Sequence, residues 1–369
     1  MQNMMRNIAI SLLLACIPLL HASPMAAQLE SLSTGMKAPE FSRPDLEGKE
    51  HDQDEFFKEG STTVLLFWSP DNRKSPSALK DLEALKQRHT DKPLILVNIA
   101  VHPAETHPEG IVPVQAMVDE VGLTSLVLVD SDRFIFYEFG VIALPTTVIL
   151  DADRTILYAL AGYPLVQSEH MIEFLEGVLT GRTQDEVVTP SGPRPNKSAV
   201  RNLNLARKTA RKRTMTSMAS TYYQKAIDAD PGFILPYIEM SDLLQCKGDL
   251  DASRAVLENA EANIPDHPQI LTRKARLLIT EKKLEEARAL LTDVVEKHPL
   301  DPHGHYLLGH CLSLLEAYEE AEISFNNSIE LNPFNPAVYD YRARMNERRG
   351  NKEAAAADYR MASELLVKE

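Results

Sequence analysis

The C-terminal half of the chain contains a sequence repeat with a period of 34 residues. Prolines that share this spacing stand at Pro231, Pro265, Pro299 and Pro333. Twelve residues before each proline stands a small residue, at Ala219, Ser253, Ala287 and Ala321. A fixed period of this length predicts a stack of helical hairpins, because a single unit cannot bury its own apolar face.

The details of this repeat resemble the tetratricopeptide repeat (TPR). Small residues stand where two helices cross, a large apolar residue follows on the second helix, and a proline ends the unit. Leu308-Gly309 matches the first-helix signature in the fourth unit, and Ala355, Tyr359 and Ala362 continue the register into a fifth. The resemblance implies an all-α TPR solenoid of about five repeats at 198–369, with a groove that binds another protein or peptide.

Residues from about 35 to 180 alternate strand-like and helix-like stretches. The predicted strands are Thr62–Phe67, Leu94–Val101, Ser125–Val129, Thr146–Leu150 and Thr155–Ala159. The predicted helices are Pro76–His89, Ile111–Val121 and Ser168–Leu179. This alternation predicts a sheet with helices packed on its faces. Residues 181–197 are polar, rich in proline and without periodicity, and they are interpreted as a linker.

Three segments of this first module resemble the exported TlpA-like and AhpC/TSA-like redoxins of the thioredoxin superfamily. Gly35–Phe41 (GMKAPEF) resembles their opening, and Val64–Trp68 (VLLFW) resembles the central strand that leads into the redox loop. Gly140–Thr147 resembles the loop that carries the cis-proline of the family, here Pro145. The resemblance implies an α/β thioredoxin-like domain at 35–180, followed by the all-α TPR solenoid.

The residues that carry redoxin chemistry are missing. The family needs Cys-x-x-Cys at the start of the helix after Trp68, where the helix N-terminus lowers the thiol pKa. The aligned loop reads Asn72-Arg73-Lys74-Ser75, and no cysteine occurs between residues 17 and 245. Hydroxyl groups do not exchange disulfides. We therefore expect a non-catalytic protein without a cofactor, and a thiol–disulfide oxidoreductase or antioxidant remains the alternative that the resemblance suggests.

The altered loop has two interpretations. In the first, it is only a helix start, with Ser75 as the N-cap and Pro76 at the first helical position. In the second, Asn72, Ser75 and Pro145 form a polar site that holds a peptide, since the cis-proline loop of the family lies beside the redox loop and holds extended substrate. The sequence leaves both open.

The candidate groove residues of the array are mostly basic or aromatic. They are Arg201, Asn204, Lys208, Arg211, Lys212, Arg276, His303, Tyr306 and His310. The stretch 201–213 holds six basic residues and no acidic one, which favours an acidic peptide as partner; the alternative is a solvated capping helix. His303 and His310 are seven residues apart, about 10 Å along a helix, so no metal site is expected.

The N-terminus is interpreted as a targeting segment. Residues 1–27 combine Arg6 with the apolar run Ile8–Leu20 and small residues up to Ala27, which predicts a secretory signal peptide and an exported protein of the bacterial periplasm or cell envelope. Leu13-Leu14-Ala15-Cys16 resembles a lipobox, so a lipid anchor at Cys16 is the alternative. The net charge of −14 argues against nucleic acid as a partner, and no segment is apolar for long enough to span a membrane.

Overall fold

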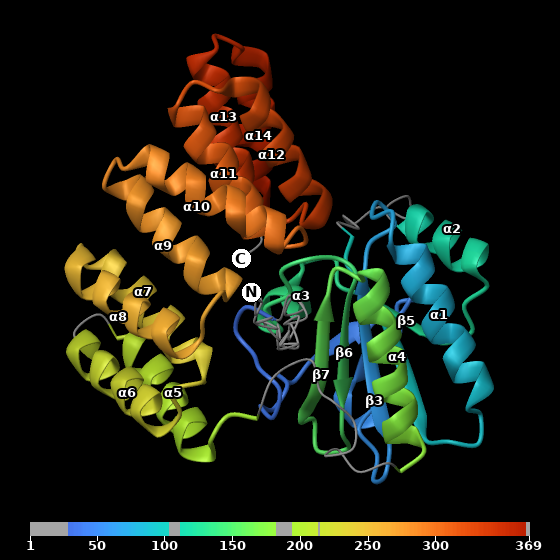
Figure 1. Ribbon diagram of the computed structural model, residues 1–369. Coiled ribbons are helices and arrows are strands. Elements are labelled where there is room, and N and C mark those ends of the chain that lie inside the picture. The colour runs from blue at the N-terminus through green and yellow to red at the C-terminus, as the bar shows by residue number, and fades with distance from the viewer. Residues whose placement is uncertain (1–28, 103–110, 182–193, 213–214, 367–369) are drawn as a thin grey trace, which may run out of the picture.

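The computed structural model describes residues 29–102, 111–181, 194–212 and 215–366 (Figure 1). The predicted signal peptide at 1–27, Cys16 and most of the linker at 181–197 lie outside these residues. Within the described residues, none of the helices combines the length and the apolar character that a membrane crossing requires.

The N-terminal domain is built on one mixed sheet. Its strands among the described residues are β3 (Thr62–Trp68), β4 (Leu94–Ala100), β5 (Leu126–Val129), β6 (Thr146–Leu150) and β7 (Ile156–Ala161), in the order β5-β4-β3-β6-β7. β3 pairs in parallel with β4 and antiparallel with β6, which places the sheet's centre at β3. All five predicted strands are present. The structure adds a separate small pair, β1 (Ser42–Pro44) and β2 (Glu50–Asp52), which the sequence pattern did not indicate because each strand has only three residues.

The two faces of this sheet have different partners. Val64, Leu66 and Trp68 point to one face, where α1 (Ser75–Arg88) and α4 (Leu165–Leu179) cover them. Leu65 and Phe67 alternate to the other face, as a strand requires. That second core includes residues of α3 (Phe134–Glu138) and continues without a break into the helical array. α2 (Val112–Val121) lies at the β5 end of the sheet (Figure 1).

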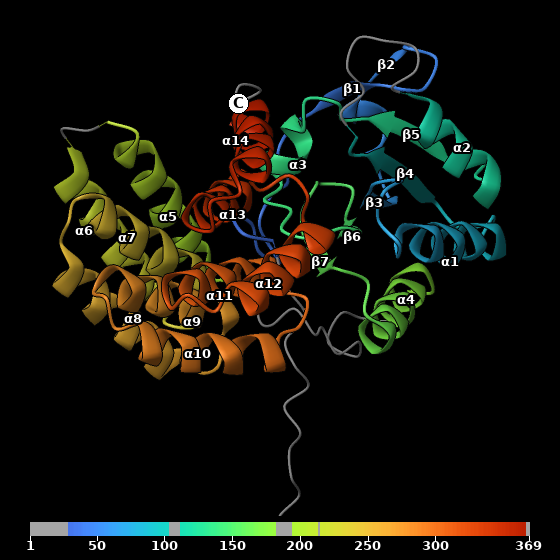
Figure 2. The same ribbon diagram turned by 90° about the horizontal axis from the view of Figure 1, so that it is seen from above.

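The rest of the described chain is all helical and forms a curved array (Figure 2). Its hairpins are α5/α6 (Lys197–Ala210, Thr216–Ala229), α7/α8 (Ile234–Cys246, Leu250–Asn263), α9/α10 (Pro268–Thr280, Leu284–Lys297), α11/α12 (Pro302–Leu314, Tyr318–Leu331) and α13/α14 (Pro336–Arg348, Lys352–Leu366). Each repeat proline follows a second helix, as predicted. Gly309 shows why small residues are needed at the crossing, since a Cβ there would lie 2.9 Å from the Phe325 ring.

The first hairpin departs from the 34-residue register. α9, α11 and α13 each begin 34 residues after the preceding first helix, whereas α7 begins 37 residues after α5. The connection between α5 and α6 is longer than the others, so α5 starts earlier and buries Ala199, Leu203 and Ala206. The residues of α5 that the 34-residue period assigned to the groove therefore do not lie at the positions that the period implies.

Candidate functional site

The loop at the start of α1 is held by its own hydrogen bonds. Asn72 accepts the Lys74 N–H through Oδ1 at 2.9 Å, and its carbonyl accepts the Ser75 N–H at 3.1 Å. The Ser75 hydroxyl is fully buried and accepts the Ser69 N–H at 3.3 Å. The prediction that Ser75 is the N-cap was wrong: Lys74 precedes the helix and Ser75 is its first residue. The hydroxyl closes the loop between β3 and α1.

The cis-proline loop lies beside this helix start and is covered by the chain itself. The Leu144–Pro145 peptide bond is cis. Asn72 Nδ2 donates to the Leu144 carbonyl at 3.0 Å and to the Glu330 carbonyl at 3.3 Å. The Leu144 N–H donates to the Leu331 carbonyl at 3.0 Å. The C-terminal end of α12 therefore lies across the face where a peptide site at Asn72, Ser75 and Pro145 was one interpretation.

Aromatic packing extends this contact into an interface. Phe334, just after α12, packs edge-on against Phe136 of α3 with ring centroids 5.6 Å apart. The guanidinium of the buried Arg133 lies 5.6 Å from the centre of the Phe334 ring. The Tyr137 hydroxyl donates to the Phe334 carbonyl at 3.0 Å. Aromatic packing and a hydrogen bond therefore join the segment after α12 to α3 of the N-terminal domain.

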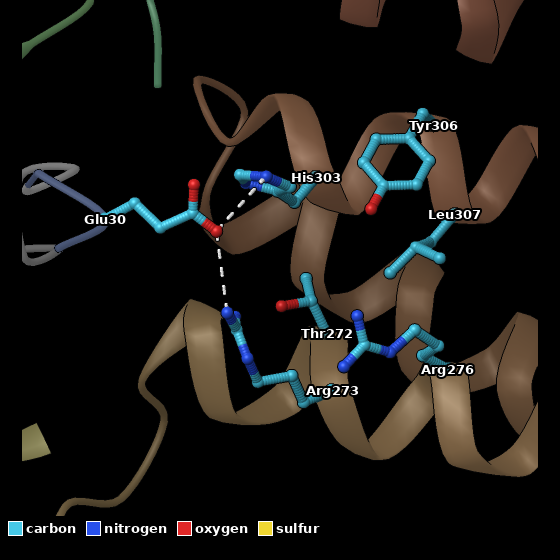
Figure 3. Close-up of a pocket in the computed structure, with 7 residues that line it drawn as sticks. All are labelled: Glu30, Thr272, Arg273, Arg276, His303, Tyr306 and Leu307. Atoms are coloured by element: carbon cyan, nitrogen blue, oxygen red, sulfur yellow. Dashed lines mark ion pairs between the residues drawn. The ribbon is translucent and has the colours of Figure 1, made fainter. Parts of the chain in front are cut away.

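A small pocket lies on the array, between α9 and α11 (Figure 3). Its lining residues are Glu30, Thr272, Arg273, Arg276, His303, Tyr306 and Leu307. The structure thus brings together three predicted groove residues, Arg276, His303 and Tyr306. His310 is not among them, because its ring stacks on Tyr341 at 4.0 Å. Burial and nearby arginines lower the pKa of His310 to about 4.

The acidic residue in this pocket comes from the N-terminal end of the described chain. Residues 29–32, here called the strap, run between the array and the N-terminal domain (Figure 1). The Glu30 carboxylate lies 3.5 Å from Arg273 Nη2 and 3.9 Å from His303 Nε2. The Glu30 N–H donates to the Gly140 carbonyl at 2.7 Å, and Arg207 Nη2 donates to the Ser31 carbonyl at 2.7 Å. The strap was assigned to neither predicted domain.

The pocket is electropositive apart from Glu30. Burial lowers the pKa of Arg273, but the charges of Asp242 and Glu30 outweigh this and raise it overall. For His303, burial likewise lowers the pKa, while Glu30 and Asp301 raise it above its ordinary value. Both side chains are therefore stabilised as cations, and what they recognise here is a carboxylate.

The five basic or polar residues predicted in the first hairpin lie elsewhere. Arg201, Asn204, Lys208, Arg211 and Lys212 are all exposed, and none lines the pocket.

Arg207, which was not among the candidates, holds the strap and pairs with Glu239 at 3.0 Å. In the 34-residue sequence period, Arg207 corresponds to Ser241, Ala275 and Gly309, which are all small. A large basic residue at this position was the sequence signal that could have identified Arg207.

The described residues contain no group of three histidine, cysteine or acidic side chains placed to hold a metal ion. The two cysteines within the described residues lie in the array and not at the redox loop. Cys246 is exposed at the end of α7. Cys311 is buried, donates to the Leu284 carbonyl at 3.2 Å, and has its pKa raised by burial to about 11.

Family comparisons agree with this two-part architecture. Residues 34–159 match the model of the AhpC/TSA family, and residues 247–311 and 302–335 match two tetratricopeptide repeat models. No curated protein matches the chain significantly.

Solved structures resemble each part separately. MamA (residues 41 to the end) from Desulfovibrio magneticus RS-1 is 22% identical, with a TM-score of 0.37 over 47% of this chain and 98% of that one. The thioredoxin domain of a thiol-disulfide oxidoreductase from Bacteroides vulgatus is 16% identical, with a TM-score of 0.34 over 40% of this chain and 99% of that one. The chain is thus an AhpC/TSA redoxin domain without a cysteine pair, followed by tetratricopeptide repeats.

Proposed function

We propose that the protein is a non-catalytic adaptor of the bacterial cell envelope, in which the TPR array holds another polypeptide and the redoxin domain supports the array. One observation carries this proposal: the end of α12 covers the cis-proline loop, while the pocket between α9 and α11 is lined by residues of the array together with one described side chain of the strap, Glu30. Repeat arrays of this kind bind proteins through such surfaces.

The enzymatic alternative requires a thiol where the chain has none. The redox loop offers Asn72 and the buried hydroxyl of Ser75, and the end of α12 lies over the cis-proline loop. We expect no insulin reduction and no peroxide turnover from the full chain. Turnover that survives the double substitution Cys246→Ser with Cys311→Ser would establish an enzyme and contradict the adaptor.

Location in the envelope rests on the N-terminal sequence. Arg6 and the apolar run Ile8–Leu20 favour export, with cleavage near Ala27. The mass of the mature protein tests this, because cleavage after Ala27 and lipidation at Cys16 give different masses. A full-length cytoplasmic protein would contradict export.

Binding is tested by photo-crosslinking in the intact protein. A photoreactive amino acid replaces Tyr306, which lines the pocket, and in a matched protein it replaces Ile323, which is exposed on α12. We expect a discrete protein adduct from position 306 and none from position 323. Identical adducts from both positions, or no adduct from either in envelope extract, would contradict a partner in the groove.

A further inference from the structure

We propose that the pocket between α9 and α11 is a carboxylate-binding site for a short acidic segment of the partner, and that the chain's own strap fills it until the partner replaces it. This inference rests on the proposed adaptor function and specifies the chemistry of its ligand. The strap enters the pocket as a ligand does, with one side chain reaching cations from two different hairpins (Figure 3).

The two sides of the contact differ in burial. The Arg273 side chain is 10% exposed, whereas the Glu30 side chain is 44% exposed. The cationic side is therefore part of the packed array, and the carboxylate lies at its rim. A replacement carboxylate can approach Arg273 from the side on which Glu30 remains open to solvent.

The cations keep their positions without Glu30. Asp242 accepts from Arg273 Nε at 3.1 Å and also pairs with Arg276, whose Nε donates to Gln245 at 3.1 Å. His303 lies 3.6 Å from the buried Asp301 carboxylate. Because these contacts come from the array itself, the site persists when the strap leaves.

The charged side chains of the array around the pocket carry one more positive than negative charge when His303 is protonated. With His303 protonated, three cations (Arg273, Arg276 and His303) face two carboxylates of the array, Asp242 and Asp301. Glu30 supplies the third carboxylate and brings the formal sum to zero. Without the strap the pocket holds a net positive charge, which favours a carboxylate over a neutral side chain.

The strap also indicates the sequence around the ligand carboxylate. Leu29 and Leu32 are 2% and 8% exposed, so the acid is flanked by apolar side chains one residue before and two residues after it. The strap bends at Glu30 and Ser31, where its backbone contacts Gly140 and the Arg207 side chain. The ligand class is therefore a short acidic segment of the pattern apolar-acid-x-apolar.

A direct test uses the strap sequence as a separate peptide. The probe is acetylated, fluorescently labelled Leu-Glu-Ser-Leu-Ser-Thr, and the protein is the full chain with Glu30→Ala, which removes the internal carboxylate from the pocket. We expect this variant to bind the probe at least about tenfold tighter than the wild-type chain, because the internal carboxylate no longer competes. A probe with Gln in place of Glu should bind about tenfold more weakly or worse.

Two further variants show where the probe binds. His303→Gln, added to Glu30→Ala, removes one cation with little change in size and should weaken binding severalfold. Arg211→Ala, at the exposed end of α5, should change nothing. Circular dichroism and the Tm establish that each variant is folded. Equal binding of the Glu and Gln probes, or equal binding by wild type and Glu30→Ala, would overturn the proposal.

Other outcomes separate this inference from the adaptor function. If crosslinking at position 306 succeeds while the Glu and Gln probes bind equally, the adaptor stands and carboxylate recognition is overturned. If the wild-type chain is a dimer by light scattering, and Glu30→Ala makes it a monomer, the strap of a second copy is the ligand and the partner assignment is overturned.

Discussion

Two surfaces of this protein are covered by its own chain, and they are covered in different ways. On the redoxin domain, the end of α12 forms a backbone hydrogen bond to Leu144, and Phe334 packs between Phe136 and Arg133. On the array, a half-exposed glutamate of the strap reaches Arg273 and His303. The first contact buries a large aromatic side chain, whereas the strap combines a polar contact at the pocket rim with the buried side chains of Leu29 and Leu32.

This difference assigns a role to each surface. Burial of a phenylalanine contributes about 2 kcal/mol or more, so the redoxin face is closed as part of the fold. The half-exposed ion pair of the strap contributes about 0–1 kcal/mol. A ligand of the same apolar-acid-x-apolar pattern can replace both this ion pair and the buried side chains of Leu29 and Leu32. The face beside the cis-proline loop is a structural interface, and the pocket of the array is the site that we propose to be exchangeable.

The largest expected effect follows from loss of the aromatic contact. Phe334→Ala removes a buried ring from the interface, and we expect a loss of about 3 kcal/mol in the free energy of unfolding. Denaturant unfolding measures the loss, and small-angle scattering should show a larger radius of gyration. The matched control Phe134→Ala, at a ring that is 47% exposed, should cost below about 1 kcal/mol. Equal effects of the two substitutions would mean that Phe334 does not hold the domains together.

A smaller effect is expected from the cation in the pocket. Arg273→Ala leaves Asp242 without one of its partners, and we expect a loss of about 2 kcal/mol, discounted for the partial exposure of Asp242. Chemical denaturation measures it. Glu30→Ala removes only the rim carboxylate and should cost below about 1 kcal/mol. If Glu30→Ala costs as much as Arg273→Ala, the strap is as fixed as the interface and is not exchangeable.

A substitution in the loop at Asn72 should cost about half as much free energy of unfolding as Arg273→Ala. Asn72→Ala removes the amide that donates to the Leu144 and Glu330 carbonyls, and we expect a loss of about 1 kcal/mol. Thermal unfolding reports it. Arg73→Ala is the neighbouring control, because this exposed side chain makes only a surface ion pair with Glu330 at 3.7 Å. An unchanged Tm for Asn72→Ala would show that Asn72 does not help to hold the end of α12 against the cis-proline loop.

The smallest effect is a pH dependence of the strap. The folded-state pKa of His303 is raised above its ordinary value of 6.5, so its contribution to stability is fully present below about pH 6.5 and is lost as pH rises through the folded-state value. The free-energy difference between wild type and His303→Gln should be largest near pH 5.5, below about 1 kcal/mol, and should shrink at pH 9. A difference that grows with pH would reverse the assigned sign.

Much of the architecture was accessible from sequence. The 34-residue period predicted the hairpins, and alternation predicted the strands of the main sheet, because both patterns reflect the burial of apolar faces. β1 and β2 were missed because strands of three residues carry too few positions to show a period. α3 was missed for the same reason.

Only part of the candidate site could be predicted from the sequence. Arg276, His303 and Tyr306 followed from repeat positions, and the structure places them in one pocket. Arg207 was missed because the longer connection after α5 shifts that helix out of the period. Glu30 could not be found from sequence, since its partners lie more than 240 residues away and no local pattern links them.

Native-state hydrogen exchange at two amides tests the central difference most directly. The Leu144 N–H donates to Leu331 across the interface, and the Glu30 N–H donates from the strap to Gly140 of the N-terminal domain. The account predicts that Leu144 exchanges only with the large opening that separates the domains, whereas Glu30 exchanges through local release of the strap, orders of magnitude faster. Equal protection of the two amides, or faster exchange at Leu144, would contradict a closed redoxin face beside an exchangeable pocket.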